Sequence, residues 1–291
     1  MLSYQEIAFF ETFGFLVAKG LFLQNEVKII QEESDSILDE DRGGEKFSGE
    51  GRQAVLGFVE RRPFLSTLPS DERIFDRIED LLGHEFMWMG GDGNLYVGDT
   101  HWHSDSTGND YEFGFDRIKV ALYLDPVKKE TGCLRVIPGS HKIQLHQQLE
   151  PLRHLRLTQK DAGGGGNMVT TKQLVEQGIT SIDPRPFGVS SDELPCTSIE
   201  SEPGDVVFFN QRLWHSSFGG KTGRRMFTLN FCVRPNIEED FQTLNENYKA
   251  VQGMIKSAKN PTGQVYSDAF HNSEDPKIQR MMAIPKELNF K

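Results

Sequence analysis

Three residues have the types and the spacing needed to hold a metal ion, and an arginine follows them in the chain. His103 and Asp105 stand two positions apart, His215 follows 112 residues after His103, and Arg224 follows nine residues after His215. Residues i and i+2 of a β-strand project from the same face, so a strand over 100–105 would let His103 and Asp105 bind one ion together. Two histidines and one carboxylate on one face of an octahedron leave three positions open, as in non-heme Fe(II) oxygenases. The pattern therefore predicts a reactive metal site.

Two neighbouring arginines follow His215, and either could face the candidate site. The planar fork of a guanidinium can bind a carboxylate through two hydrogen bonds. In a strand, Arg224 and Arg225 would point to opposite faces, so only one of them can face the site. The first face continues with mixed residues and the second with large apolar ones: Met226, Thr228 and Asn230 against Phe227, Leu229 and Phe231. The mixed face better suits a site lining, which favours Arg224 and leaves Arg225 as the alternative.

Each candidate ligand also has an ordinary structural interpretation. His103 and Asp105 could form a hydrogen-bonded pair, and His215 could be a core histidine with its hydrogen bonds satisfied. His101 shares the His103 face and is an alternative ligand. The tryptophans beside the two histidines, Trp102 and Trp214, should point to the opposite face and pack beneath the site.

The first part of the chain is predicted to be helical. Ser3 followed by Glu6 is a capping-box pattern that opens a helix through about Thr12. A second helix should run from an Asn25 cap to about Asp39, and a third should begin after Ser70. The Gly-Phe-Leu-Val segment after the first helix reads as a strand.

From residue 86 onward, short segments rich in β-formers predominate. The expected strands cover residues 86–89, 94–97, 100–105, 117–124, 133–137, 205–210, 213–217 and 224–233. Helices followed by about eight short strands indicate a mainly β fold with flanking helices, a sandwich or barrel. A long polar segment over 142–200 contains four consecutive glycines, 163–166, and is expected to be either a mobile excursion over the barrel mouth or a surface loop.

Composition limits the classes of partner. The chain has 291 residues, a formal charge of −11 and a pI near 5.3, which argue against nucleic acid or an anionic membrane as the main partner. Three cysteines without a CxxC spacing indicate neither a disulfide framework nor a thiolate zinc site. Glu6 and Glu11 among the first apolar residues and the lack of a membrane-length apolar run support neither a signal peptide nor a membrane span. A cytoplasmic protein is therefore expected, as a monomer or homodimer.

Several strings together resemble the phytanoyl-CoA dioxygenase family of Fe(II)/2-oxoglutarate-dependent oxygenases. They are Trp102-His103-Ser104-Asp105, the run from Thr131-Gly132-Cys133-Leu134 to Ile137-Pro138-Gly139-Ser140-His141, Pro203-Gly204-Asp205 through His215, and Arg224-Arg225. The resemblance spans roughly residues 5 to 235 and implies a double-stranded β-helix, the cupin-like jelly roll. It gives His103, Asp105 and His215 the roles of iron ligands, and Arg224 the role of binding the far carboxylate of 2-oxoglutarate.

The resemblance also implies a layout and an activity. One dioxygenase domain would fill residues 1–291, with N-terminal helices over 1–85, a jelly-roll core over 86–235 interrupted by the 142–200 insertion, and a C-terminal extension over 236–291. Fe(II), 2-oxoglutarate as co-substrate and O₂ would support hydroxylation of an unactivated C–H bond in a small-molecule metabolite, releasing succinate and CO₂. Asp105 argues against a halogenase, because halide-transferring relatives lack this carboxylate. The alternatives are a catalytically silent jelly-roll protein that binds a small molecule and, with less support, a zinc-dependent hydrolase.

Overall fold

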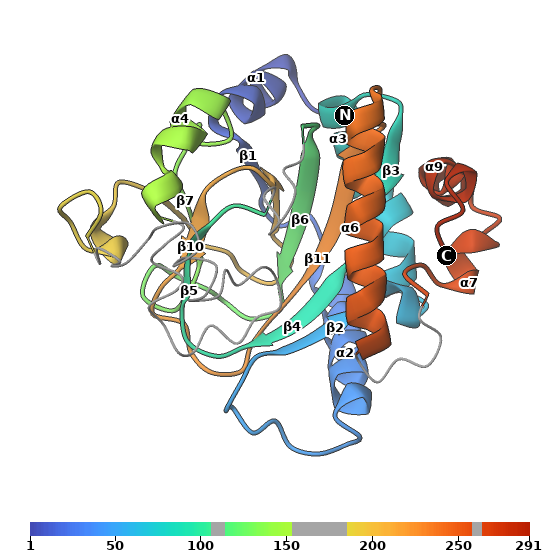
Figure 1. Ribbon diagram of the computed structural model, residues 1–291. Coiled ribbons are helices and arrows are strands. Elements are labelled where there is room, and N and C mark those ends of the chain that lie inside the picture. Colours follow the sequence, from blue (N-terminus) through green and yellow to red (C-terminus); the bar gives the residue numbers. More distant parts are fainter. Residues whose placement is uncertain (106–113, 153–184, 258–263) are drawn as a thin grey trace.

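A computed structural model describes residues 1–105, 114–152, 185–257 and 264–291, and shows two antiparallel sheets with helices on the outside (Figure 1). The larger sheet has the order β1-β9-β6-β11-β4-β2, with β3 also paired to β11, and the smaller sheet has the order β5-β10-β7-β8. The described strands are β1 (Phe15–Ala18), β2 (Gln53–Leu56), β3 (Phe86–Trp88), β4 (Asp92–Tyr96), β5 (Thr100–His103), β6 (Arg117–Tyr123), β7 (Leu134–Val136), β8 (Thr197–Ile199), β9 (Val206–Asn210), β10 (His215–Ser217) and β11 (Arg224–Val233).

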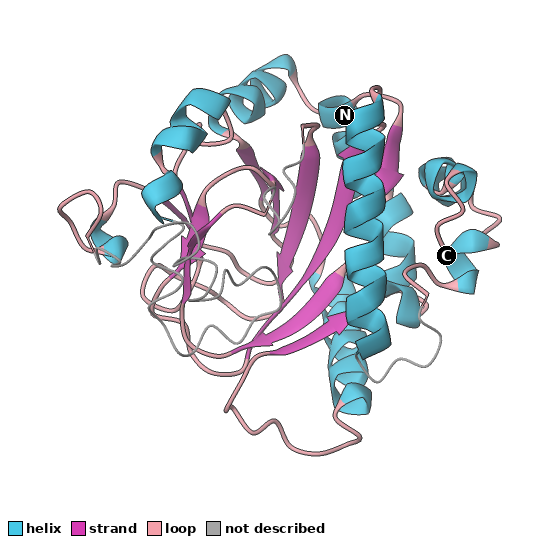
Figure 2. Ribbon diagram, viewed as in Figure 1, coloured by secondary structure: helices cyan, strands magenta, loops and turns pink. Residues whose placement is uncertain are grey.

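The helices come from both ends of the chain. The α-helices of the described segments are α1 (Tyr4–Phe13), α2 (Gln24–Asp41), α3 (Glu72–Leu82), α4 (Ile143–Gln148), α6 (Glu238–Ser257), α7 (Asp268–His271), α8 (Pro276–Met281) and α9 (Ala283–Glu287), and the 3₁₀ helices are η1 (Val59–Arg61), η2 (Leu65–Ser70) and η4 (Ser191–Glu193). Figure 2 shows most of these helices gathered beside the larger sheet. No helix in the described ranges is long and apolar enough to cross a membrane.

Strand alternation divides the interior into an outer core and a second apolar cluster between the sheets. On β6, Ile118, Val120 and Leu122 join the core that contacts the helices, while Ala121 and Tyr123 join the apolar cluster shared with the smaller sheet. Strand β9 follows the same rule, with Val206 and Phe208 in the outer core. This two-sheet architecture is the expected jelly roll, mainly β with flanking helices.

Local sequence explains two of the helix starts, and one expectation was wrong. The Ser3 hydroxyl accepts the Glu6 N–H while the Glu6 carboxylate accepts the Ser3 N–H, so the predicted capping box is present. Helix α2 is capped at Leu23 and not at Asn25. The Glu26 carboxylate accepts the Leu23 N–H at 2.8 Å, so the third helical residue satisfies the helix end without a polar side chain at the cap.

The strand predictions were largely confirmed, with two differences. Strand β5 ends at His103, so Asp105 lies beyond the strand and not inside it as expected. Strands β2 and β8 are additional; they have three or four residues each, too few to show a clear alternation. The C-terminal extension forms helices α6 to α9.

The 142–200 segment is more structured at its ends than a surface excursion would be. It begins with α4 and ends with η4 and β8, and β8 pairs with β7 at the edge of the smaller sheet. The glycine run 163–166 lies outside the described residues.

Candidate metal centre

Direct strand pairing brings the two histidines together. His103 is the last residue of β5 and His215 is the first residue of β10, and the two strands are antiparallel with His215 opposite His103. The ring centroids lie 4.1 Å apart. A separation of 112 residues in sequence therefore becomes a cross-strand contact.

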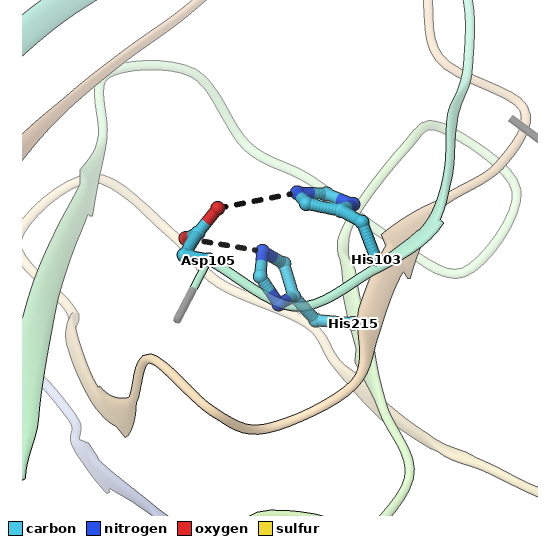
Figure 3. Close-up of side chains that lie close together, drawn as sticks. All are labelled: His103, Asp105 and His215. Carbon is cyan, nitrogen blue, oxygen red and sulfur yellow. Dashed lines mark ion pairs between the residues drawn. The ribbon is translucent and has the colours of Figure 1, made fainter. Parts of the chain in front are cut away.

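The Asp105 carboxylate completes a group of three (Figure 3). Its Oδ1 lies 3.6 Å from His103 Nε2, and its Oδ2 lies 3.5 Å from His215 Nε2. Each residue offers one ligand atom, and these three atoms lie within 4.8 Å of one another. Nitrogen and carboxylate oxygen suit Fe(II), so the residues fit such an ion.

Backbone carbonyls orient both imidazole rings so that Nε2 of each ring faces the Asp105 carboxylate. His103 Nδ1 lies 2.7 Å from the His101 carbonyl, and His215 Nδ1 lies 2.9 Å from the Leu213 carbonyl. A carbonyl only accepts, so each Nδ1 carries the proton and each Nε2 keeps a lone pair directed at the centre of the group. Such contacts orient metal-binding histidines.

The environment keeps the carboxylate ionised. Burial acts to raise the pKa of Asp105, but the positive charge of Lys119 beside it opposes burial, and that pKa lies well below its usual range. Lys119 Nζ lies 2.6 Å from Asp105 Oδ2. An ionised carboxylate and two Nε2 lone pairs can bind a divalent cation without first losing protons.

Arg224 is buried against Ser217 of β10, two residues after His215, and two of its donors have no partner in the described part of the chain. It is 6 % exposed, and its Nη2 donates to Ser217 Oγ at 3.1 Å. Its Nε and Nη1 are buried without a hydrogen-bond partner among the described residues. Buried unsatisfied donors are costly, so a carboxylate ligand would fit here. Arg225 instead forms ion pairs with Asp35 and Asp125 on the other side of β11.

Two glycines make room for the Arg224 guanidinium. A side chain at Gly132 or Gly220 would collide with Arg224 Nη1. Gly132 also has a φ of 88°, in the region that favours glycine. The glycine of the Thr-Gly-Cys-Leu string therefore has a physical role next to the arginine.

The remaining sequence candidates lie around the group and not inside it. His101 stacks edge-on against Phe218, while Trp102 and Trp214 are buried in the apolar cluster outside the smaller sheet, as predicted. His141 Nε2 contacts the Glu11 carbonyl. The sequence analysis missed Lys119, whose position on the inner face of β6 was the available indication, and Ser217, two residues after His215.

A jelly roll that carries two histidines and a carboxylate between its sheets defines a metal-dependent class of cupin-like proteins. The family model described as phytanoyl-CoA dioxygenase matches residues 10–227, well over half of the chain. The chain therefore belongs to the phytanoyl-CoA dioxygenase family of Fe(II)/2-oxoglutarate-dependent oxygenases, as its sequence strings indicated. The comparison with curated proteins found no match.

Solved structures share the fold at low sequence identity. HygX from Streptomyces hygroscopicus, with nickel and 2-oxoglutarate bound, has a TM-score of 0.54 at 18% identity, covering 80% of this chain and 87% of its own. EctD from S. alaskensis, with bound Fe, has a TM-score of 0.54 at 19% identity, covering 80% of this chain and 77% of its own. The α-ketoglutarate-dependent carbocyclase SnoK from nogalamycin biosynthesis has a TM-score of 0.55 at 18% identity, covering 84% and 90%.

Proposed function

We propose that this protein uses Fe(II) and 2-oxoglutarate to hydroxylate an unactivated C–H bond of a small-molecule metabolite, with release of succinate and CO₂. One observation carries the proposal. The Nε2 atoms of His103 and His215 both face the Asp105 carboxylate, and the three ligand atoms lie within 4.8 Å of one another. The family to which the chain belongs and the fold neighbours with iron, nickel or 2-oxoglutarate bound support it.

Each residue has a separate role. His103, Asp105 and His215 would hold Fe(II), which when bound together with 2-oxoglutarate activates O₂ for attack on the substrate C–H bond. Arg224 would bind the far carboxylate of 2-oxoglutarate through guanidinium donors that have no hydrogen-bond partner among the described residues. Ser217 orients Arg224 by accepting from Nη2 and donating to the Gly132 carbonyl at 2.9 Å.

We treat the chain as one domain and expect a cytoplasmic location. Support for a single domain comes from the outer core, which contains residues from Phe10 to Phe290. Support for a reducing compartment comes from Cys133, Cys196 and Cys232, which are all free.

The test is anaerobic addition of Fe(II) and 2-oxoglutarate to the purified protein. We expect a weak visible charge-transfer band, followed by succinate when air is admitted. His103→Ala and Asp105→Ala should abolish the band, whereas His84→Ala should keep it because that imidazole is 72% exposed and lies outside the group. A protein that gives neither band nor succinate would be a silent binding protein, and one purified with zinc that hydrolyses a substrate would be a hydrolase.

A further inference from the structure

Asp105 is held differently from the two histidines. His103 and His215 lie in paired strands, whereas Asp105 lies two residues beyond the end of β5. Its backbone N–H donates to the Gln211 carbonyl at 2.9 Å, in the loop between β9 and β10. A ligand outside the strand needs further contacts to keep the orientation that a metal requires.

Two cationic side chains of β6 supply these contacts. Arg117 and Lys119 are two positions apart on one strand, so they project from the same face. Arg117 Nη2 donates to the Asp105 backbone carbonyl at 3.0 Å. Lys119 Nζ donates to Asp105 Oδ2 at 2.6 Å. Strand β6 therefore forms hydrogen bonds with both the backbone carbonyl and the carboxylate of Asp105.

The contacts of Arg117 with Asp105 belong to a hydrogen-bond network that extends into the larger sheet. Arg117 also donates to Gln211 Oε1, and Gln211 Nε2 donates to Asn230 Oδ1 of β11 at 2.9 Å. The Gln211 backbone N–H donates to the Arg117 backbone carbonyl at 2.9 Å. Asp105 is thus connected to β6 and β11 by side chains that form hydrogen bonds with one another.

We propose that Arg117 and Lys119 are positioning residues that form a clamp on Asp105 and prepare its carboxylate for the metal. The inference rests on the proposed function, because it assigns Asp105 as a metal ligand. An oxygen already bound to an ammonium group is a weaker ligand, so the clamp favours coordination through Oδ1 alone. Single-oxygen binding would leave three positions of an octahedral ion for other ligands.

The direction of the change in metal affinity on substituting Lys119 distinguishes a positioning role from a purely electrostatic one. Lys119→Met removes a positive charge beside the metal, and on charge alone this would strengthen binding of a divalent cation. Loss of positioning weakens it, by about 10- to 100-fold for partners of metal ligands. We expect the weaker binding in anaerobic titrations with Co(II), followed by its visible absorption. Lys119→Arg, which keeps the cation and its donors, should restore most of the affinity.

A matched control is available at the other end of the sheet. Lys19 pairs with Asp205 at 2.8 Å, and neither residue contacts the candidate ligands. Lys19→Met removes a lysine–aspartate pair of the same kind and should leave Co(II) binding unchanged. Circular dichroism checks the folding of each variant.

The outcomes distinguish the two proposals. If the wild-type protein does not bind Co(II), the proposed function fails. If the wild type binds and Lys119→Met binds equally or more tightly, only the clamp is overturned. Should Lys119→Met fail to fold, Arg117→Met tests the contact with the Asp105 backbone carbonyl. It leaves the Lys119–Asp105 pair in place and should also weaken Co(II) binding.

Discussion

At the scale of single residues, the candidate site depends on which atoms are already occupied. The two Nδ1 atoms are bound to backbone carbonyls, so only Nε2 of each ring is available to an ion. Arg224 presents the reverse case, because two of its donors lack partners within the described residues. Occupied atoms fix orientation, and unoccupied ones indicate where ligands bind.

The two arginines of β11 should respond differently to substitution. Arg224→Met removes the candidate carboxylate partner, so we expect the KM for 2-oxoglutarate to rise about 10- to 100-fold, the effect of losing charge-assisted hydrogen bonds. Arg225→Met removes ion pairs with Asp35 and Asp125 and should cost about 1 kcal/mol of stability with little change in KM. Steady-state kinetics and thermal melts measure both. Equal KM values for the two variants would contradict the assignment.

Gly132→Ala tests the space beside the guanidinium. A methyl group there collides with Arg224, so we expect the KM for 2-oxoglutarate to rise and the protein to lose about 1–3 kcal/mol of stability. Gly43 has a φ of 69° but nothing near its Cβ position, so Gly43→Ala controls for backbone strain alone. That control should lose some stability and keep its KM. A rise in KM in both variants would remove the role given to Gly132.

At the scale of elements, one buried carboxyl group joins three segments. Glu60 of η1 accepts hydrogen bonds from Trp88 Nε1 of β3 at 2.8 Å and from the N–H of Ser267, the cap of α7, at 2.6 Å. Burial raises the pKa of Glu60, although these hydrogen bonds oppose the shift. The contact ties the C-terminal helices to the larger sheet through a group whose charge is disfavoured.

This raised pKa predicts a direction for stability against pH. The unfolded Glu60 ionises at its usual pKa, so its contribution is fully present below that value and is lost as the pH rises through the higher folded pKa. Glu60→Gln cannot ionise. Thermal melts should therefore show the variant gaining stability relative to wild type as the pH rises from about 5 to 8. A difference that is constant with pH would show that the carboxyl group does not titrate differently in the folded protein.

Glu26 provides a control of opposite sign. The hydrogen bond with Arg73 lowers the pKa of Glu26, so its stabilising contribution is present above the usual pKa and is lost as the pH falls through the folded one. Glu26→Gln should be less stable than wild type at neutral pH, and the difference should shrink in acid.

At the scale of the whole molecule, metal binding should stabilise the fold because His103 and His215 lie on β5 and β10, which pair only in the folded protein. A divalent ion at 100 times its Kd adds about 2.7 kcal/mol, which corresponds to a rise in Tm of roughly 5 °C for a chain of this size. Thermal melts with anaerobic Fe(II) or Co(II) measure the effect, and a chelator should reverse it. Asp105→Ala should show no response. An equal rise in that variant would place the binding elsewhere.

The sequence alone determined the fold class and the identity of the candidate ligands. The helix spacing, the alternation in 117–124 and 224–233, and the strings around His103 and His215 are local patterns, and local patterns set which face a side chain occupies. That information was enough to place Phe227 and Leu229 in the outer core. It also favoured Arg224 over Arg225 as the residue facing the site.

Only the tertiary structure decided which of these faces meet. The pairing of His103 with His215, the clamp of Arg117 and Lys119 on Asp105, and the packing of Arg224 against Gly132 all join segments far apart in the chain. Strand pairing and register set these contacts, and no local pattern encodes them. Asp105 shows most clearly what local sequence patterns cannot predict. Strand β5 ends at His103, two residues earlier than predicted, so Asp105 is not positioned by its own strand. Contacts from Arg117 and Lys119 of β6 position its carboxylate instead.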